Sequence, residues 1–295
     1  MQVLAIMGPT GVGKTAVAIE VARRLREQGE DPVAVSCDAL QVYRGLEALT
    51  GAPTALETEG LEHRLVGIVD PAEEFSAGRF ASLARAEIDS LLAEERRPIV
   101  VGGTGLYMRA ALADLDLKPP VAPEIRAAVQ AELDERGPAA LHRELEPDVS
   151  AKVHPNDRKR ISRALELQRA GQDPPERSGA LWTARLRHPT VLVAVIVERA
   201  ELEHRIDMRV DGMLAAGAAD QARAAAAAGV SRTARAALGF DALLVDDADS
   251  VKRAHRSYAK RQLTWIRKMP DLTQIERTGR DDAWVAERIS QVLDA

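Results

Sequence analysis

Residues 3–15 read VLAIMGPTGVGKT, an apolar run followed by a glycine-rich turn, a lysine and a threonine. The segment matches G-x-x-x-x-G-K-[ST] in full and lies between an expected strand at 3–7 and an expected helix at 15–28. In that setting, successive backbone N–H groups converge on phosphate oxygens at the start of the helix. The expected phosphate-binding residues are Gly8, Pro9, Thr10, Gly11, Val12, Gly13, Lys14 and Thr15. Lys14 supplies a mobile positive charge, and Thr15 offers its hydroxyl to Mg²⁺.

Beyond this loop, short apolar runs alternate with amphipathic stretches. Strands are predicted at 33–36, 65–69, 99–101 and 191–197, with a helix at 77–95 before the third of these. This alternation is typical of a parallel sheet covered by helices, that is, of an α/β fold. Further helices are predicted at 200–216, 220–228, 233–246, 249–269 and 283–293.

The pattern changes at Leu115. Prolines at 119, 120 and 123, and again Pro174 and Pro175, bracket a stretch, 124–170, that has only helical periodicity. We therefore expect an α/β core formed by residues 1–114 and 186–295, interrupted by a small all-helical insertion domain at 115–185.

Composition indicates a protein without a membrane segment. Apolar residues make up 46% and charged residues 29%, and no apolar run approaches the roughly 20 residues of a membrane span. The apolar start leads straight into glycines, so we expect a first strand there and not a signal peptide. Cys37 is the only cysteine, which excludes a disulfide framework. We expect a soluble, cytoplasmic, monomeric protein.

Basic residues are concentrated in two places, although Asp and Glu outnumber Lys and Arg by 45 to 40. The stretch 251–269 holds seven Lys or Arg residues and no acid, and a second cluster lies at 152–163. Phosphate contacts are local, so an acidic protein with two such clusters can still bind a polyanion. Taken alone, the clusters are more typical of two solvated helix faces.

A carboxylate follows the second expected strand. Asp38 comes two residues after the strand at 33–36, and the carboxyl ends of parallel strands line the ligand crevice of such sheets. Beside a phosphate-binding loop, we expect Asp38 to act as a general base or to hold a metal-bound water. In isolation, the same residue would be interpreted as a helix cap.

The strand at 99–101 ends in Gly102-Gly103-Thr104-Gly105. An ATPase usually carries a magnesium-associated aspartate at such a strand end. Here two glycines would let a ligand approach the backbone, and Thr104 can donate or accept a hydrogen bond. The pattern therefore departs from that of nucleotide-hydrolysing proteins. It favours a phosphate-binding loop that binds a different substrate.

Several segments together resemble the tRNA dimethylallyltransferases, also called isopentenylpyrophosphate transferases. After GPTGVGKT come DALQVYRG at 38–45, VGGTGLY at 101–107, HPNDRKRISRALE at 154–166, RIDMRVDGML at 205–214 and KRQLTWIR at 260–267. The segments keep the family's order and cover most of the chain. The phosphate-binding loop alone is shared by many families, whereas DALQVYRG followed by VGGTGLY is highly specific.

The resemblance implies a P-loop kinase-like α/β body whose helical insertion grips the anticodon stem-loop of tRNA. It also implies that dimethylallyl pyrophosphate, held by the loop with Mg²⁺, donates its prenyl group to the adenosine 3′ of the anticodon, flipped into a channel. In the family, the residue matching Asp38 is the general base, and the one matching Thr104 faces the reacting groups. The positions implied in tRNA binding are Asp38, Ala39, Leu40, Gln41, Thr104, Arg126, Lys159, Arg160, Ile161, Ser162 and Arg163.

The chain departs from the family in two segments. Residues 49–54 read LTGAPT and lack a lysine that is common in the family. Residues 235–241 read RAALGFD, with the arginine one place early and Phe240 where a tyrosine is usual.

Three other functions are open: a P-loop kinase for a small molecule, an adenylate isopentenyltransferase acting on free AMP, ADP or ATP, and a non-catalytic RNA-binding protein. The kinase leaves GGTGLY and the insertion unexplained. The basic cluster at 152–163 favours tRNA over a free nucleotide. Lys14, Thr15, Asp38 and Thr104 together favour an enzyme.

Overall fold

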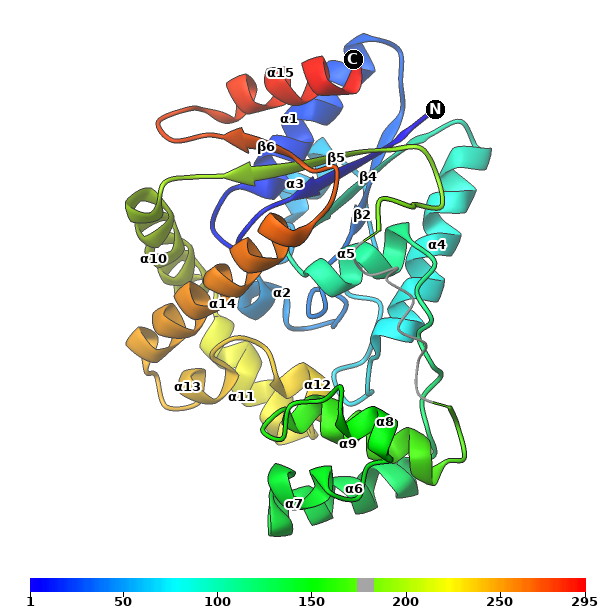
Figure 1. Cartoon of the computed structure of the whole chain (residues 1–295). Helices are drawn as coiled ribbons and strands as arrows, with labels where there is room; N and C mark the ends of the chain where they lie inside the picture. The colour runs from blue at the N-terminus through cyan, green and yellow to red at the C-terminus, as the bar shows by residue number, and fades with distance from the viewer. Residues whose placement is uncertain (174–182) are drawn as a thin grey trace. The chain divides into compact units, whose positions relative to one another are not determined.

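The computed structural model of the chain describes residues 1–173 and 183–295 (Figure 1). Within these residues there is one sheet of six parallel strands, in the order β3-β2-β4-β1-β5-β6. The strands are β1 (Val3–Met7), β2 (Pro32–Ser36), β3 (His63–Arg64), β4 (Arg97–Gly102), β5 (Thr190–Ile196) and β6 (Thr273–Glu276). Because every strand runs the same way, all their carboxyl ends meet at one edge, where ligands bind in sheets of this kind.

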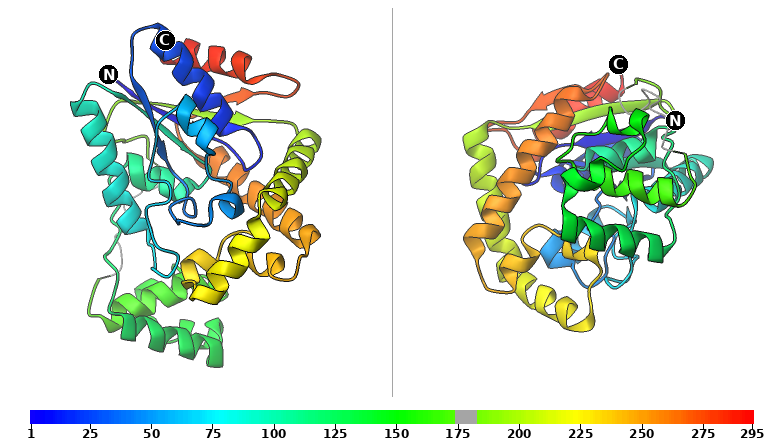
Figure 2. Two further views of the ribbon diagram at one scale, coloured as in Figure 1. Left: turned by 180° about the vertical axis from the view of Figure 1, so that it is seen from behind. Right: turned by 60° about the horizontal axis from the view of Figure 1, so that its bottom comes forward.

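Helices cover both faces of the sheet, which explains why the inner strands are mainly apolar. Every residue of β1 and β2 is buried. Helices α1 (Lys14–Glu27) and α15 (Asp282–Leu293) pack together on one face, and α4 (Ala77–Ala93) and α5 (Gly105–Leu112) lie on the other (Figures 1 and 2). The α/β class predicted for the body is confirmed.

A second group of helices belongs to the same compact unit. The longest of them, α10 (Arg199–Ala215) and α14 (Ala248–Lys268), pack against each other (Figure 1). The remaining helices of this unit are α2 (Glu47–Thr50), α3 (Ala55–Gly60), α11 (Ala218–Ala228), α12 (Arg232–Arg235) and α13 (Phe240–Leu243). Across the described parts of the chain, none of the helices combines the length and the apolar character that crossing a membrane requires.

Three elements differ from the sequence prediction. The strand predicted at 65–69 is replaced by β3, which ends at Arg64 because Leu65 has a left-handed backbone (φ 63°). The single helix predicted at 233–246 is two short helices, separated at Gly239, whose φ is 79°. Strand β6 was not predicted, because only Ile275 of its four residues is buried and it pairs on one side, with β5.

The second compact unit spans Asp116–Ser178, and its described residues form helices joined by loops. Its helices are α6 (Pro123–Arg136), α7 (Pro138–His142), α8 (Pro147–Ser150) and α9 (Arg158–Arg169). Three of them begin with proline, whose fixed φ suits the first helical position. Val129, Leu133, Ile161 and Leu165 form its core between α6 and α9. The expected closing pair, Pro174 and Pro175, lies outside the described residues.

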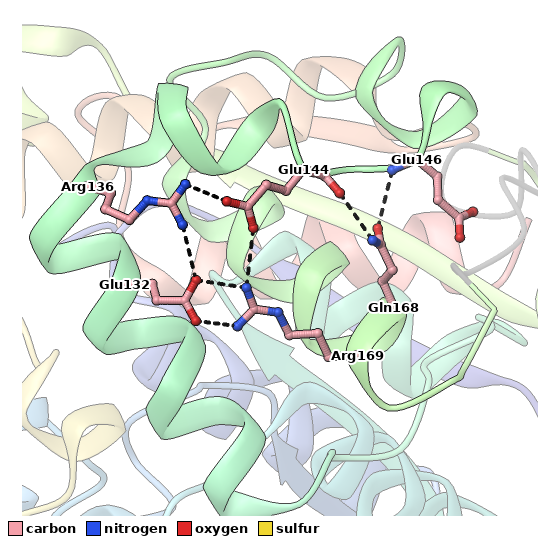
Figure 3. A network of polar contacts seen from close by, with 6 residues as sticks. All are labelled: Glu132, Arg136, Glu144, Glu146, Gln168 and Arg169. Carbon is pink, nitrogen blue, oxygen red and sulfur yellow. Dashed lines mark hydrogen bonds and ion pairs between the residues drawn. The ribbon is translucent and has the colours of Figure 1, made fainter.

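An ion-pair network joins the helices of this unit (Figure 3). The guanidinium of Arg169 on α9 binds both carboxylate oxygens of Glu132 on α6, at 2.6 and 2.8 Å. Arg136 bridges Glu132 and Glu144, at 3.5 and 2.5 Å. The Arg169 contact holds the pKa of Glu132 below its usual value. Such a network fixes the angle between α6 and α9 more firmly than isolated surface pairs would.

Candidate active site at the carboxyl edge of the sheet

The phosphate-binding loop connects β1 to α1 and contains two left-handed glycines. Gly11 and Gly13 have φ values of 82° and 91°, which side-chain-bearing residues rarely adopt. Helix α1 begins at Lys14, so the N–H groups of its first turn have no partner within the helix. These two features, left-handed glycines and unpaired N–H groups at a helix start, are those that an anion-binding loop requires.

Lys14 folds back over this loop. Its Nζ donates to the carbonyl oxygens of Gly8 and Pro9, both at 3.0 Å. Burial, together with the nearby Arg209 guanidinium, lowers the pKa of Lys14 to about 8, although the Asp38 carboxylate raises it. An arriving phosphate would raise this pKa again, because its negative charge favours the protonated ammonium group.

Asp38 reaches the same edge from β2. Its Oδ1 accepts from the backbone N–H of Leu40 at 2.9 Å, which orients the carboxylate within its own turn. Burial lowers the pKa of both Lys14 and Arg209, and the negative charge of Asp38 offsets part of that lowering. The carboxylate thus shares a site with the positive groups around the loop.

Thr104 arrives from β4, the strand between β1 and β2 in the sheet. It is the residue before α5, and its Oγ1 lies 2.8 Å from the phenolic oxygen of Tyr258 on α14. The loop, Asp38 and Thr104 therefore come from three neighbouring strands, because parallel pairing places their carboxyl ends side by side.

The glycines of the GGT segment serve protein packing. A Cβ at Gly102 would stand 2.8 Å from the carbonyl carbon of Cys37, and one at Gly103 would stand 2.8 Å from the Gly8 carbonyl oxygen. The expectation that these glycines admit a ligand is therefore corrected: the atoms that approach them belong to the neighbouring strand end, to the loop and to the side chain of Gln262 on α14. Cys37 itself is a buried packing residue. Burial raises the pKa of its thiol, which therefore stays neutral and is not a nucleophile.

Helices α10 and α14 contribute residues to which the sequence alone assigned no role. Gln262 accepts from the backbone N–H of Thr10 at 2.8 Å, and Tyr258 is bound to Thr104. Arg209 donates to the carbonyls of Thr50 and Gly51 at 3.3 and 3.1 Å. For Arg209 and Gln262, the signal that could have found them is their place in the segments 205–214 and 260–267, which resemble the family, whereas Tyr258 lies outside both segments.

A buried histidine lies near these groups on α14. His255 is 4% exposed, and neither of its ring nitrogens has a hydrogen-bond partner within the described structure. Burial and the charge of Arg209 lower the pKa of His255 to about 4, so the ring is neutral at physiological pH.

The metal-ligand capacity of the site is small. In the described regions no three acids, histidines or cysteines gather closely enough to hold a metal ion. The loop offers the hydroxyl of Thr15 at the start of α1, and Asp38 offers a carboxylate. This donor set fits Mg²⁺, which binds through one or two protein oxygens, substrate phosphates and water.

The expected tRNA-binding residues after β2 are held firmly in place. Gln41 accepts from Ser36 Oγ at 2.9 Å and donates to the Gly51 carbonyl at 3.0 Å, while Ala39 and Leu40 are partly exposed. Tyr43, in the same segment, is 1% exposed and its hydroxyl lies 2.6 Å from Thr233 Oγ1. It is a core residue and is not free to stack on a base.

The expected tRNA-binding residues on α9 divide into exposed and buried ones. Lys159 and Arg160 are exposed at the start of the helix. Arg163 donates to the carbonyls of Lys118 and Pro119, at 3.0 and 2.7 Å, and so ties the start of this unit to α9. The first two are the more accessible to a phosphate, and of these Arg160 also pairs with Asp157 at 3.4 Å.

Three further expected residues lie in the same unit. The side chain of Ile161 is completely buried in its core, so that side chain cannot contact tRNA. Ser162 donates to Glu166 at 3.1 Å, and Arg126 on α6 is partly exposed.

The positive charge of the basic stretch 251–269 is partly neutralised. Lys252 pairs with Asp211 at 2.6 Å and Arg256 pairs with Asp207, so acids of α10 oppose the basic face of α14. This stretch therefore presents less positive charge than its sequence suggests.

The two segments that depart from the family have structural roles. The carbonyl of Gly51 accepts from both Gln41 and Arg209. Phe240 is 1% exposed in the core, and Arg235 pairs with Asp241 at 2.7 Å.

This arrangement defines a class of protein. A phosphate-binding loop beside one carboxylate and a threonine, without the strand-end aspartate of an ATPase, is suited to transferring a group from a phosphorylated donor.

Comparisons with known proteins give the family. A family model described as IPP transferase matches residues 41–269, and one described as isopentenyl transferase matches residues 1–75. A tRNA dimethylallyltransferase from Anaeromyxobacter dehalogenans is 41% identical over 281 residues, covering 91% of this chain and 92% of that protein. The chain therefore belongs to the tRNA dimethylallyltransferases, a family of prenyl-transferring enzymes.

Solved structures agree with this assignment. A full-length tRNA isopentenylpyrophosphate transferase from Bacillus halodurans is similar with a TM-score of 0.70 and 32% identity, covering 99% of this chain and 97% of that one. One from Staphylococcus epidermidis has a TM-score of 0.69 and 27% identity, covering 100% and 99%.

Proposed function

We propose that the chain transfers the dimethylallyl group of dimethylallyl pyrophosphate to N6 of the adenosine 3′ of the anticodon in tRNA. The products are N6-isopentenyladenosine in tRNA and pyrophosphate. The observation that carries this proposal is the meeting of the loop, Asp38 and Thr104 at adjoining strand ends in a chain of this family.

The loop is suited to the leaving group. As the bond between the allylic carbon and oxygen breaks, its electron pair stays on pyrophosphate, where negative charge grows. The N–H groups at the start of α1 and the ammonium group of Lys14 are already placed to stabilise that charge. A Mg²⁺ ion bound by Thr15 and the phosphates would supply further charge neutralisation.

Asp38 is suited to the nucleophile. The exocyclic amine of adenine is weakly nucleophilic because its lone pair is delocalised into the ring. When that lone pair forms the new C–N bond, the nitrogen must lose a proton, and the Asp38 carboxylate accepts it. Thr104, held by Tyr258, is positioned to hydrogen-bond the reacting groups.

The tRNA would be held by two sets of residues. The segment Asp38 to Gln41 follows β2 and is partly exposed, and the exposed Lys159 and Arg160 of the helical unit are suited to backbone phosphates. Arg126 and Ser162 complete the set in that unit.

One assay separates the open functions. Dimethylallyl pyrophosphate labelled in the allyl group is incubated with total tRNA, with AMP, or with neither. We expect label in tRNA alone. Label in AMP alone would make the protein an adenylate isopentenyltransferase. In a parallel incubation with ATP, consumption of ATP without prenyl transfer would make it a kinase.

A further inference from the structure

An arginine outside the segment matched by the IPP transferase model touches the phosphate-binding loop. Arg277 directly follows β6 and is 3% exposed. Its Nη1 donates to the carbonyl oxygen of Val12 at 2.8 Å and lies 2.9 Å from Oδ1 of Asp282. Its Nη2 donates to the carbonyl of Arg280 at 3.2 Å. The guanidinium is therefore shared between the loop and the turn before α15.

The Val12 contact determines how the next amide points. The peptide between Val12 and Gly13 is planar and trans, so its C=O and N–H point in opposite directions. Arg277 holds the C=O on the side of β6, which leaves the Gly13 N–H directed away from Arg277. A donor bound to the carbonyl also polarises the peptide and makes its N–H a stronger donor.

The packing leaves little room for another arrangement. Gly13 has a φ of 91°, and a Cβ there would stand 2.7 Å from Nη1 of Arg277, so a side chain at this position would displace the guanidinium from Val12. The backbone N–H of Arg277 donates to the carbonyl of Ile196 at 2.9 Å, which continues the pairing of β6 with β5. The arginine is thus anchored by the sheet itself.

We propose that Arg277 is a positioning residue, which keeps the Val12–Gly13 peptide oriented for binding of the pyrophosphate group. This inference rests on the proposed function, in which the loop holds pyrophosphate. It makes the strand that was absent from the sequence prediction, β6, part of the support of the active site.

The test measures binding of inorganic pyrophosphate with Mg²⁺ by calorimetry, and of tRNA separately, for matched variants. Arg277→Gln should weaken pyrophosphate affinity about tenfold, equivalent to about 1.4 kcal/mol, as expected for one charge-assisted hydrogen bond. Arg277→Lys keeps the charge and should lose less, and tRNA affinity should stay unchanged in both. Arg280→Gln is the control, since Arg280 is exposed and stacks on Trp284, with its guanidinium carbon 5.1 Å from the ring.

The outcomes separate the two proposals. If Lys14→Ala loses pyrophosphate affinity while both Arg277 variants keep it, Arg277 has no positioning role and the proposed function stands. Equal losses for pyrophosphate and tRNA would mean a general structural role and would also overturn the inference. If the unaltered protein and Lys14→Ala bind pyrophosphate equally, the loop is not its site and both proposals fall. Urea unfolding identifies any variant that is not folded. If Arg277→Gln does not fold, the pyrophosphate affinity of Arg277→Lys tests the positioning role.

Discussion

The hydroxyl oxygen of Tyr258 lies 2.8 Å from Oγ1 of Thr104, although 154 residues separate them in sequence. Burial and the nearby Asp38 raise the pKa of Tyr258 far above its ordinary value, so its hydroxyl stays protonated and able to donate. The contact joins α14 to the end of β4, where Thr104 is proposed to hydrogen-bond the reacting groups.

Tyr258→Phe should therefore lower kcat about threefold to tenfold, the value of one hydrogen bond, with little change in KM for dimethylallyl pyrophosphate. If Tyr258 acts through Thr104, the same substitution should have no further effect in a Thr104→Val background. Steady-state kinetics on the two single variants and the double variant measure this coupling. Full additivity would show that Tyr258 acts independently of Thr104.

Asp38→Asn keeps the shape of the side chain and removes its basicity. If Asp38 accepts the amine proton, kcat should fall roughly 10²–10⁴-fold, the usual range for a general base, while binding of both substrates changes far less. Asp31→Asn is the matched control, because Asp31 precedes the opposite end of the same strand and pairs with Arg96 at 2.6 Å. A loss confined to KM would make Asp38 a residue that only positions the substrate.

Lys14 should make pyrophosphate binding depend on pH. Its pKa is about 8 in the free protein and a bound polyanion raises it, so binding takes up a proton above that pH. Pyrophosphate affinity should fall as pH rises above about 8, by at most tenfold per pH unit. In Lys14→Arg the guanidinium stays charged. The affinity of this variant should therefore stay constant over the roughly two pH units around pH 8 to 9. Equal pH profiles would contradict this role for Lys14.

The same shift has the opposite sign for folding of the free protein. The pKa of Lys14 is lower in the folded state than its ordinary value of 10.5, so the folded protein binds fewer protons between the two values. This group therefore makes stability rise with pH from about 8 to about 10.5. Urea unfolding of the free protein and of Lys14→Arg across that window measures the difference.

The exposed basic residues of α9 should control the salt dependence of tRNA binding. Replacing Lys159 and Arg160 together by Ser should weaken tRNA binding and reduce the slope of log affinity against log salt by about 1.5, which corresponds to two lost phosphate contacts. Arg23→Ser with Arg223→Ser removes the same charge from exposed sites on α1 and α11 and is the control. An equal change of slope in both pairs would point to net charge alone.

Arg163 should behave differently from these two. Arg163 donates to the carbonyls of Lys118 and Pro119. Arg163→Ser should therefore reduce the stability of the helical unit, in addition to any change in tRNA affinity. This distinction was not available from the sequence, where all three residues belong to one basic cluster.

Local patterns were enough for the parts of the site that follow directly from a strand. The loop after β1, Asp38 after β2 and Thr104 after β4 could be predicted, because strand periodicity and parallel pairing place consecutive strand ends at one edge. The boundaries of α1, α4, β5 and α14 also follow from continuous hydrophobic patterns.

What the sequence determined by itself was the α/β class, the phosphate-binding loop and the family to which the chain belongs, since each depends on residues adjacent along the chain. Only the tertiary structure decided that Tyr258, Gln262 and Arg277 support the site, that GGT packs against protein, and that Ile161 is buried. Those outcomes depend on which side of a helix or strand faces a partner far away along the chain, or on the burial of one helix face, and no local pattern encodes such contacts. β6 shows the limit most clearly: a four-residue edge strand with one buried side chain has almost no hydrophobic signature, yet its end places Arg277 against the loop.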